Sequence, residues 1–118
     1  MACIFKVLTR EAWEAFGRLR VFDGSAADKA DGFIHFSTAA QLPGTLAKHY
    51  AGQTDLVLVA LEPTRMPAAA LKWEPARDGA LFPHLYDVLA FETVIEAAPL
   101  AMTEAGAHVL PAEVMRWG

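Results

Sequence analysis

An imidazole and two hydroxyl groups lie close together in the segment DGFIHFST, at residues 31–38. Because successive side chains of a strand point to opposite faces, an extended segment would place Phe33, His35 and Ser37 on one face. Imidazole and hydroxyl groups both donate and accept hydrogen bonds, which suits a sugar or a phosphate. His35, Ser37 and Thr38 are therefore candidate ligand-binding residues. The alternatives are that Ser37 or Thr38 only caps a following helix, and that His35 is a hydrogen-bonded core residue.

A second segment that combines aromatic residues with a histidine, LFPHLY, occupies residues 81–86. The side chains that share one side of this segment, if it is extended, are Phe82, His84 and Tyr86. They would form an aromatic wall with polar tips, which suits a flat ligand. Ordinary packing of an edge segment is the alternative. We predict that His35 and His84 approach one concave pocket.

A third group, Trp73, Glu74 and Arg77, lies between these two segments in the sequence. Glu74 could stabilise a developing cation, and Arg77 could grip a phosphate or a carboxylate. A solvated surface ion pair is the alternative for these two side chains. The four histidines show none of the close spacings that zinc sites use, so no metal site is predicted. We expect the other two histidines, His49 and His108, on the surface.

The elements that must position these residues are strands and short helices. Apolar strand formers predict a first strand at residues 2–8, and Thr9 predicts the N-cap of a helix. The residues expected on the apolar face of that helix are Ala12, Trp13, Phe16 and Leu19. Residues 21–32 show little periodicity, so we interpret them as an irregular loop.

The chain after the first candidate segment allows two interpretations. Thr38 and Gln41 match a capping box, but Pro43 would then fall just beyond the first turn of the helix. A short turn followed by a helix with Pro43 at its first position is the alternative. Either way, a short helix would contain Leu46, His49 and Tyr50 and end at Gly52.

The run LVLVAL at residues 56–61 predicts the central strand, because six apolar residues without alternation need cover on both faces. Residues 71–74 predict a further strand. The proline within residues 81–86 predicts an extended edge or loop segment rather than a central strand. The remaining expectations are a last strand at residues 94–97 and a tail with some helical character at residues 103–117.

Composition limits the class of protein. A chain of 118 residues predicts a single domain, 1–118, and 54% hydrophobic residues with 20% charged residues are typical of a globular protein. The formal charge is -4 and the basic residues are scattered, so we expect no nucleic-acid partner. No apolar run approaches the ~20 residues of a membrane helix, so no membrane partner is expected. The single cysteine favours a reducing compartment, and we predict a cytoplasmic protein.

Five segments are similar, in order, to the pattern of the family called domain of unknown function 952. They are GFIHFST, the helix end HYAGQ, DLVLVALEP, KWEPARDG and ALFPHLYD, and the match runs from Ile4 to about Leu100. That family resembles a remote, small member of the ADP-ribosyltransferase-like fold, which NAD-dependent toxins, poly-ADP-ribose polymerases and RNA 2′-phosphotransferases share. In that superfamily a motif of His, a small residue and Ser or Thr meets the ribose and nicotinamide of NAD. The segment that resembles this motif runs from His35 through Phe36 to Ser37 or Thr38.

The resemblance implies an α+β fold, with a compact bent or split β-core and a few short helices, ADP-ribosyltransferase-like. It implies an NAD- or ADP-ribose-like small-molecule ligand, with NAD as the candidate cofactor and with ribosyl transfer or hydrolysis. The superfamily's late catalytic glutamate could correspond to Glu74, Glu92 or Glu96. The candidate catalytic residues are His35, His84 and Glu74; the candidate ligand-contacting residues are Ser37, Thr38, Arg77, Phe82 and Tyr86. The alternative is a non-catalytic module that binds a nucleotide-like metabolite or a protein, and the sequence leaves turnover and oligomeric state open.

Overall fold

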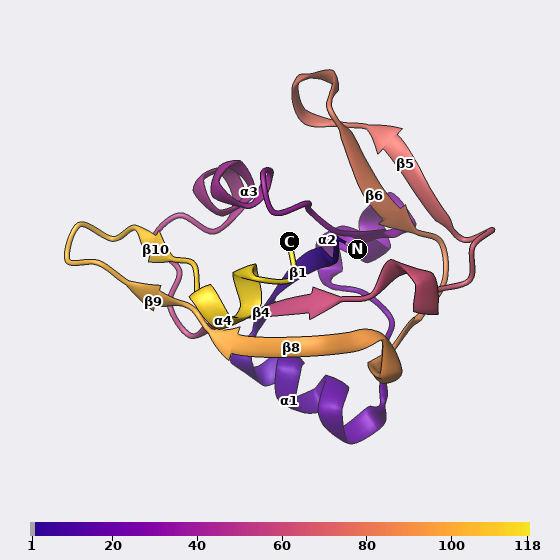
Figure 1. Ribbon diagram of the computed structural model, residues 1–118, viewed down its shortest axis with the longest axis horizontal. Helices are drawn as coiled ribbons and strands as arrows, with labels where there is room; N and C mark the ends of the chain where they lie inside the picture. Colours follow the sequence, from indigo (N-terminus) through magenta and orange to yellow (C-terminus); the bar gives the residue numbers. More distant parts are fainter. Residues whose placement is uncertain (1) are drawn as a thin grey trace.

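Two three-stranded antiparallel sheets form the centre of the fold, which a computed structural model describes over residues 2–118 (Figure 1). The strands of the first sheet lie in the order β1 (Ile4–Thr9), β4 (Leu56–Leu61) and β8 (Val94–Pro99). The strands of the second lie in the order β3 (Ile34–His35), β6 (Leu81–Leu85) and β5 (Leu71–Pro75). A backbone bridge between Phe5 and Ser37 connects the two sheets. The α+β class is thereby confirmed.

The central strand of the first sheet is β4, as the apolar run predicts. All six of its residues are buried, because apolar side chains cover both faces of the sheet. Val57, Val59 and Leu61 face the core next to α1 (Arg10–Leu19), while Leu56, Leu58 and Ala60 face α3 (Leu42–His49) and α4 (Ala112–Met115). In Figure 1, α1 lies below this sheet and α3 lies above it.

The first helix begins where Thr9 predicts. The Oγ1 atom of Thr9 accepts a hydrogen bond from the backbone N–H of Ala12 at 3.0 Å, which satisfies one of the free donors at the helix start. Phe16 is buried and packs edge-on against Phe91. The prediction for Leu19 is wrong: its exposed fraction is 63%, because the helix ends there and leaves the core.

The predicted irregular loop at residues 21–32 is wrong. It contains β2 (Val21–Phe22), which pairs with β7 (Leu89–Ala90), and the helix α2 (Ala26–Asp31). Ser25 and Asp28 form a capping box, and Gly32 ends the helix with φ of 87°. A helix of six residues is too short for apolar periodicity, so only its caps could have indicated it.

The prediction that residues 81–86 form an edge or loop segment is also wrong, since β6 is the central strand of its sheet. The last pair of β6 with β3 is His84 with His35. Pro83 lies just beyond that pair, and its carbonyl still accepts a hydrogen bond from Phe36 at 3.0 Å. The missing N–H of Pro83 therefore falls where β3 has already ended, which is how the sheet tolerates a central proline.

Both interpretations of the chain after Thr38 are correct in part. Thr38 and Gln41 exchange the two hydrogen bonds of a capping box, but these bonds close a turn that precedes the helix. The helix α3 then begins at Leu42, with Pro43 in its first turn, and ends at His49 rather than at Gly52.

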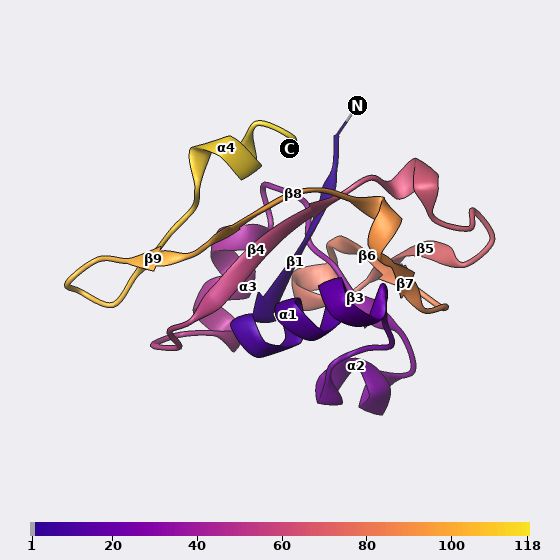
Figure 2. The ribbon, with the colours of Figure 1, turned by 90° about the horizontal axis from the view of Figure 1, so that it is seen from below.

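The remaining elements are short. The 3-10 turns are η1 (Pro63–Arg65), η2 (Arg77–Gly79) and η3 (Phe91–Thr93). After β8 come β9 (Ala101–Met102) and β10 (His108–Val109), so residues 94–97 are not the last strand. Figures 1 and 2 both place the β9–β10 hairpin at the opposite end of the molecule from the β5–β6 hairpin.

Candidate functional site

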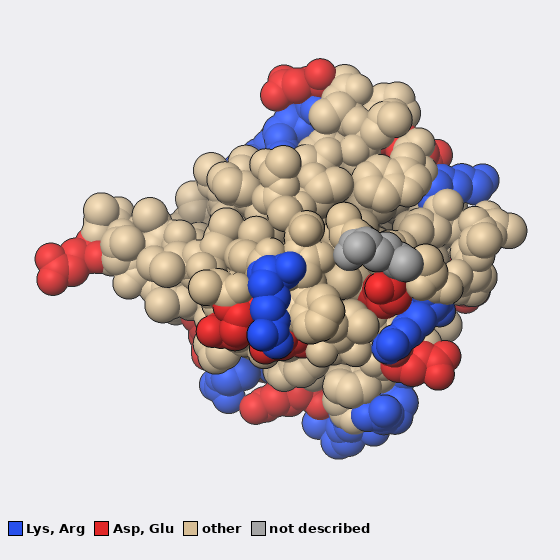
Figure 3. Space-filling view, viewed as in Figure 1, with Lys and Arg blue, Asp and Glu red and all other residues tan. Residues whose placement is uncertain are grey.

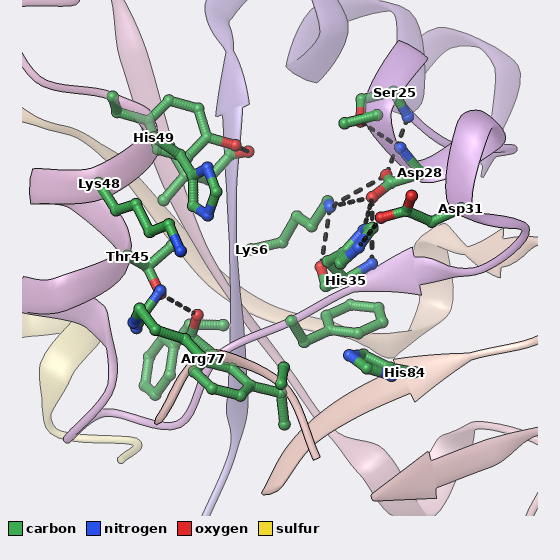
Figure 4. Close-up of a pocket in the computed structure, with 18 of the residues that line it drawn as sticks. Lys6, Ser25, Asp28, Asp31, His35, Thr45, Lys48, His49, Arg77 and His84 are labelled. Carbon is green, nitrogen blue, oxygen red and sulfur yellow. Dashed lines mark hydrogen bonds and ion pairs between the residues drawn. The ribbon is translucent and has the colours of Figure 1, made fainter. Parts of the chain in front are cut away.

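A cavity of about 570 Å³ lies between α2, α3, the strands β1 and β3, and the turn and second strand of the β5–β6 hairpin (Figure 4). This volume is within the range of small-molecule sites. Five of the predicted site residues line it: His35, Ser37, Arg77, Phe82 and His84. Because His35 and His84 are direct cross-strand partners, their ring centroids are 5.5 Å apart. The prediction that both histidines approach one pocket is confirmed.

The other three predicted site residues are not among the residues that line the cavity. Thr38 is engaged in the capping box with Gln41. Glu74 contacts His84, and Tyr86 contacts Glu74: the Tyr86 hydroxyl donates to Glu74 Oε1 at 2.7 Å, and the same oxygen lies 2.9 Å from His84 Nδ1.

The His84 ring is fixed in orientation. Its exposed fraction is 4%, and the ring of Phe33 stacks on it with 4.0 Å between centroids. The hydrogen bonds from Tyr86 and then from His84 lower the pKa of Glu74, which keeps it ionised and able to accept the Nδ1 proton. Within residues 2–118, Nε2 of His84 has no hydrogen-bond partner, so it is the nitrogen left for a ligand.

Two aspartates from α2 hold the ring of His35 from both sides. Nδ1 lies 2.6 Å from Asp28 Oδ1, and Nε2 lies 2.8 Å from Asp31 Oδ2. Ionised carboxylates only accept hydrogen bonds, so both contacts are hydrogen bonds together only when the ring carries both protons. Both ring nitrogens of His35 are therefore engaged, so the residue offers its ring face to the cavity and neither nitrogen is free to act as a base.

Lys6 is a buried cation of the cavity lining, next to Asp28 and His35, and sequence reasoning missed it. It lies in β1 between the core residues Ile4 and Leu8. Its Nζ donates to Asp28 Oδ1 at 3.1 Å and to the carbonyl of His35 at 2.8 Å. Burial lowers the pKa of Lys6, and the charge of Asp28 opposes that shift. A lysine at the centre of an otherwise apolar strand was the signal that could have identified it.

Asp28 is the centre of this network, with an exposed fraction of 3%, and it was also missed. Burial by itself raises its pKa, but three kinds of contact outweigh burial and hold the pKa well below the usual range: the His35 side chain, the charge of Lys6 and the backbone N–H groups of Ser25 and His35. The Ser-x-x-Asp spacing from Ser25 was the available signal, because it marks a helix start.

The opposite wall of the cavity is cationic. Thr45, Lys48 and His49 come from one face of α3, and Arg77 reaches it from η2 (Figure 4). The hydroxyls of Ser37 and Thr45 share a hydrogen bond of 2.8 Å. His49 is exposed, as predicted, but it also lines the cavity, so it is not remote from the site.

Three further features concern membranes, metals and surface charge. In the part of the chain that the structure describes, no helix has the length and apolar character needed to cross a bilayer, and no group of three His, Cys, Asp or Glu side chains is arranged around a metal position. On the face shown in Figure 3, acidic and basic side chains alternate along the lower edge.

The fold and the site define an α+β protein of small antiparallel sheets with a cavity lined by histidines and cations. The chain belongs to the family described as "Protein of unknown function (DUF952)", whose pattern matches residues 7–97. This confirms the family part of the predicted resemblance; the ADP-ribosyltransferase-like relationship stays a prediction.

Solved structures of protein CC0527 from Caulobacter crescentus are similar to this chain. A crystal structure has a TM-score of 0.86 and 42% sequence identity, covering 92% of this chain and 94% of that chain. A solution NMR structure has a TM-score of 0.80 and 44% identity, covering 91% of each chain. The comparison with curated proteins finds no match.

Proposed function

We propose that the cavity binds an NAD- or ADP-ribose-like ligand. The observation that carries this proposal is the pairing of His35 with His84 in one cavity that Ser37, Arg77 and Phe82 also line. The side of the cavity at His35 and His84 suits a ribose, and the guanidinium of Arg77 and the hydroxyl of Ser37 suit a phosphate.

We further propose that any reaction is hydrolysis or transfer at the ribose. The bond between ribose C1′ and the base nitrogen breaks, and its electron pair leaves with the base. Water, or another acceptor hydroxyl, then adds to C1′ and gives up a proton. His84 Nε2 takes that proton, because Glu74 holds the other ring nitrogen as a donor. Glu74 is thus a positioning residue in this proposal rather than the carboxylate that contacts the developing cation.

A non-catalytic binding module is the second candidate, and one observation favours it. Both carboxylates that line the cavity, Asp28 and Asp31, are already engaged with His35, and the nearby Glu74 is engaged with His84. A developing ribosyl cation would therefore have no unengaged carboxylate beside it within residues 2–118.

Thermal unfolding in the presence of NAD or ADP-ribose tests the binding proposal. A ligand at one hundred times its dissociation constant adds about 2.7 kcal/mol to the free energy of unfolding. We expect His84→Ala to abolish the rise in melting temperature and His108→Ala, whose side chain contacts the carbonyl of Gln53 and does not line the cavity, to keep it. His35→Ala is a poor test, because it also removes the contacts with Asp28 and Asp31. No rise with either ligand at millimolar concentration would refute the proposal.

Chromatography of NAD incubated with the wild-type protein separates the two candidates. Release of free nicotinamide that depends on His84 supports hydrolysis or transfer. Intact NAD in a sample where thermal unfolding has shown binding supports the non-catalytic module.

A further inference from the structure

The cavity contains positive charge without a protein partner. Within residues 2–118, neither Lys48 nor Arg77 forms an ion pair with a carboxylate. The third cation of the lining, Lys6, differs because Asp28 neutralises it at 3.0 Å. Two cations that face one cavity repel each other, and an anion bound between them offsets that repulsion.

The guanidinium of Arg77 is held in place by packing. It lies over the ring of Phe82, with 4.9 Å between the guanidinium carbon and the ring centroid. It also rests against Gly44 of α3, where an added methyl group would lie 3.1 Å from Nη2. Glycine inside a helix costs about 0.5–1 kcal/mol relative to alanine, and here it gives the guanidinium room to lie against the backbone.

Most of the hydrogen-bonding capacity of Arg77 remains available. Its contact with a side-chain oxygen is a long hydrogen bond of 3.4 Å from Nη2 to Thr45 Oγ1. A guanidinium has five N–H donors in a planar fork, which matches two oxygens of a phosphate.

Two hydroxyls and a lysine complete a set of donors around the same place. Ser37 is buried, with an exposed fraction of 4%, and its hydroxyl can rotate from Thr45 toward a ligand. Lys48 lies one helical turn beyond Thr45 and adds a point charge. Burial lowers the pKa of His49, and the charges of Lys48, Arg77 and His35 lower it further, so His49 adds a donor but little charge at neutral pH.

We propose that Arg77, Lys48, Ser37 and Thr45 form a subsite for a phosphoryl group. A phosphoryl group offers three acceptor oxygens, whereas a carboxylate offers two oxygens in one plane, and donors that approach from a loop, a helix and a strand suit the former. The inference deepens the proposed function and rests on it, because it assigns the phosphates of an NAD- or ADP-ribose-like ligand to this wall and the ribose to the side of His35 and His84.

Isothermal titration with ADP-ribose, inorganic pyrophosphate and adenosine tests the subsite. Losing charge-assisted hydrogen bonds should raise the dissociation constant of ADP-ribose at least about tenfold in Arg77→Gln and several-fold in Lys48→Gln. Binding of adenosine, which has no phosphate, should not change. Lys29→Gln removes the same charge on an exposed face of α2 and should bind ADP-ribose like the wild type.

Gly44→Ala provides a variant that keeps every charge. The added methyl group pushes the guanidinium of Arg77 away from α3, so we expect weaker binding of ADP-ribose and of pyrophosphate, with unchanged binding of adenosine. Circular dichroism confirms that each variant is folded before titration.

The outcomes separate the two proposals. If ADP-ribose binds the wild type and both Arg77→Gln and Lys48→Gln with equal affinity, the subsite is refuted and the proposed function stands. If pyrophosphate binds in a manner that depends on Arg77 while NAD and ADP-ribose do not bind, the subsite stands and the proposed function is refuted. If none of the probes binds the wild type, both are refuted.

Discussion

Replacing Lys6 by methionine tests whether the buried network holds α2 against the sheet. Methionine has a similar length and no charge, so the substitution removes the ammonium group and fills most of its space. The Nζ atom lies 3.1 Å and 3.0 Å from the two carboxylate oxygens of Asp28 and 2.8 Å from the carbonyl of His35. All of these contacts are lost together.

The expected loss of unfolding free energy depends on which hydrogen bonds Asp28 keeps. Removing one partner of a buried ion pair costs about 3–5 kcal/mol, because the other charge stays buried without compensation. Asp28 retains the side chain and backbone N–H of His35 and the backbone N–H of Ser25. We therefore expect the lower end, about 3 kcal/mol, which corresponds to a fall in melting temperature of roughly 12 °C for a domain of this size.

Urea unfolding followed by tryptophan fluorescence at pH 7 measures this loss. Arg10→Met is the matched control, because Arg10 forms a 2.8 Å ion pair with Asp55 in which both side chains are more than half exposed. The control should unfold close to the wild type, since solvent screens exposed pairs. A loss below about 1 kcal/mol for Lys6→Met would refute the argument, because it would place the Lys6–Asp28 pair in the same class as an exposed pair.

Three further results are expected. The free energy of unfolding should fall as the pH drops below the ordinary Asp value of 3.8, because the folded-state pKa of Asp28 is lower. Urea unfolding at several pH values measures this loss, which should be smaller in Lys6→Met than in the wild type. Equal dependence of the unfolding free energy on pH in the two proteins would contradict this prediction. Leu58→Ala should cost about 2–5 kcal/mol in the same assay, because Leu58 is fully buried in β4, and a loss well under 1 kcal/mol would place it at the surface. Glu74→Gln should change the NMR signals of the His84 ring nitrogens, because the carboxylate beside Nδ1 is lost; unchanged signals would show that Glu74 does not position His84.

Local features of the sequence were sufficient to predict an element when all the residues that determine it lie in one segment. The apolar run at residues 56–61 identifies β4, and Thr9 identifies the start of α1, because burial on both faces and an N-cap each depend on neighbouring residues only. The shared cavity of His35 and His84 was also predictable, since both histidines lie on extended segments with aromatic neighbours.

The tertiary structure alone decided how these parts combine. Lys6 and Asp28 are 22 positions apart in sequence, and nothing local to either residue indicates that they pair. The central place of β6 depends on β3 and β5 both pairing with it, which a proline within the strand argues against when the strand is considered alone.

The roles of Glu74 and His49 were likewise decided by long-range geometry. The sequence determined that an acid, a set of histidines and an arginine are present, and it determined the family to which the chain belongs. Sheet register placed Glu74 opposite Phe82 and within reach of His84, and the packing of α3 placed His49 at the cavity. Periodicity and caps are properties of adjacent residues, whereas a binding site depends on distances between residues far apart in the chain, which only the folded chain fixes.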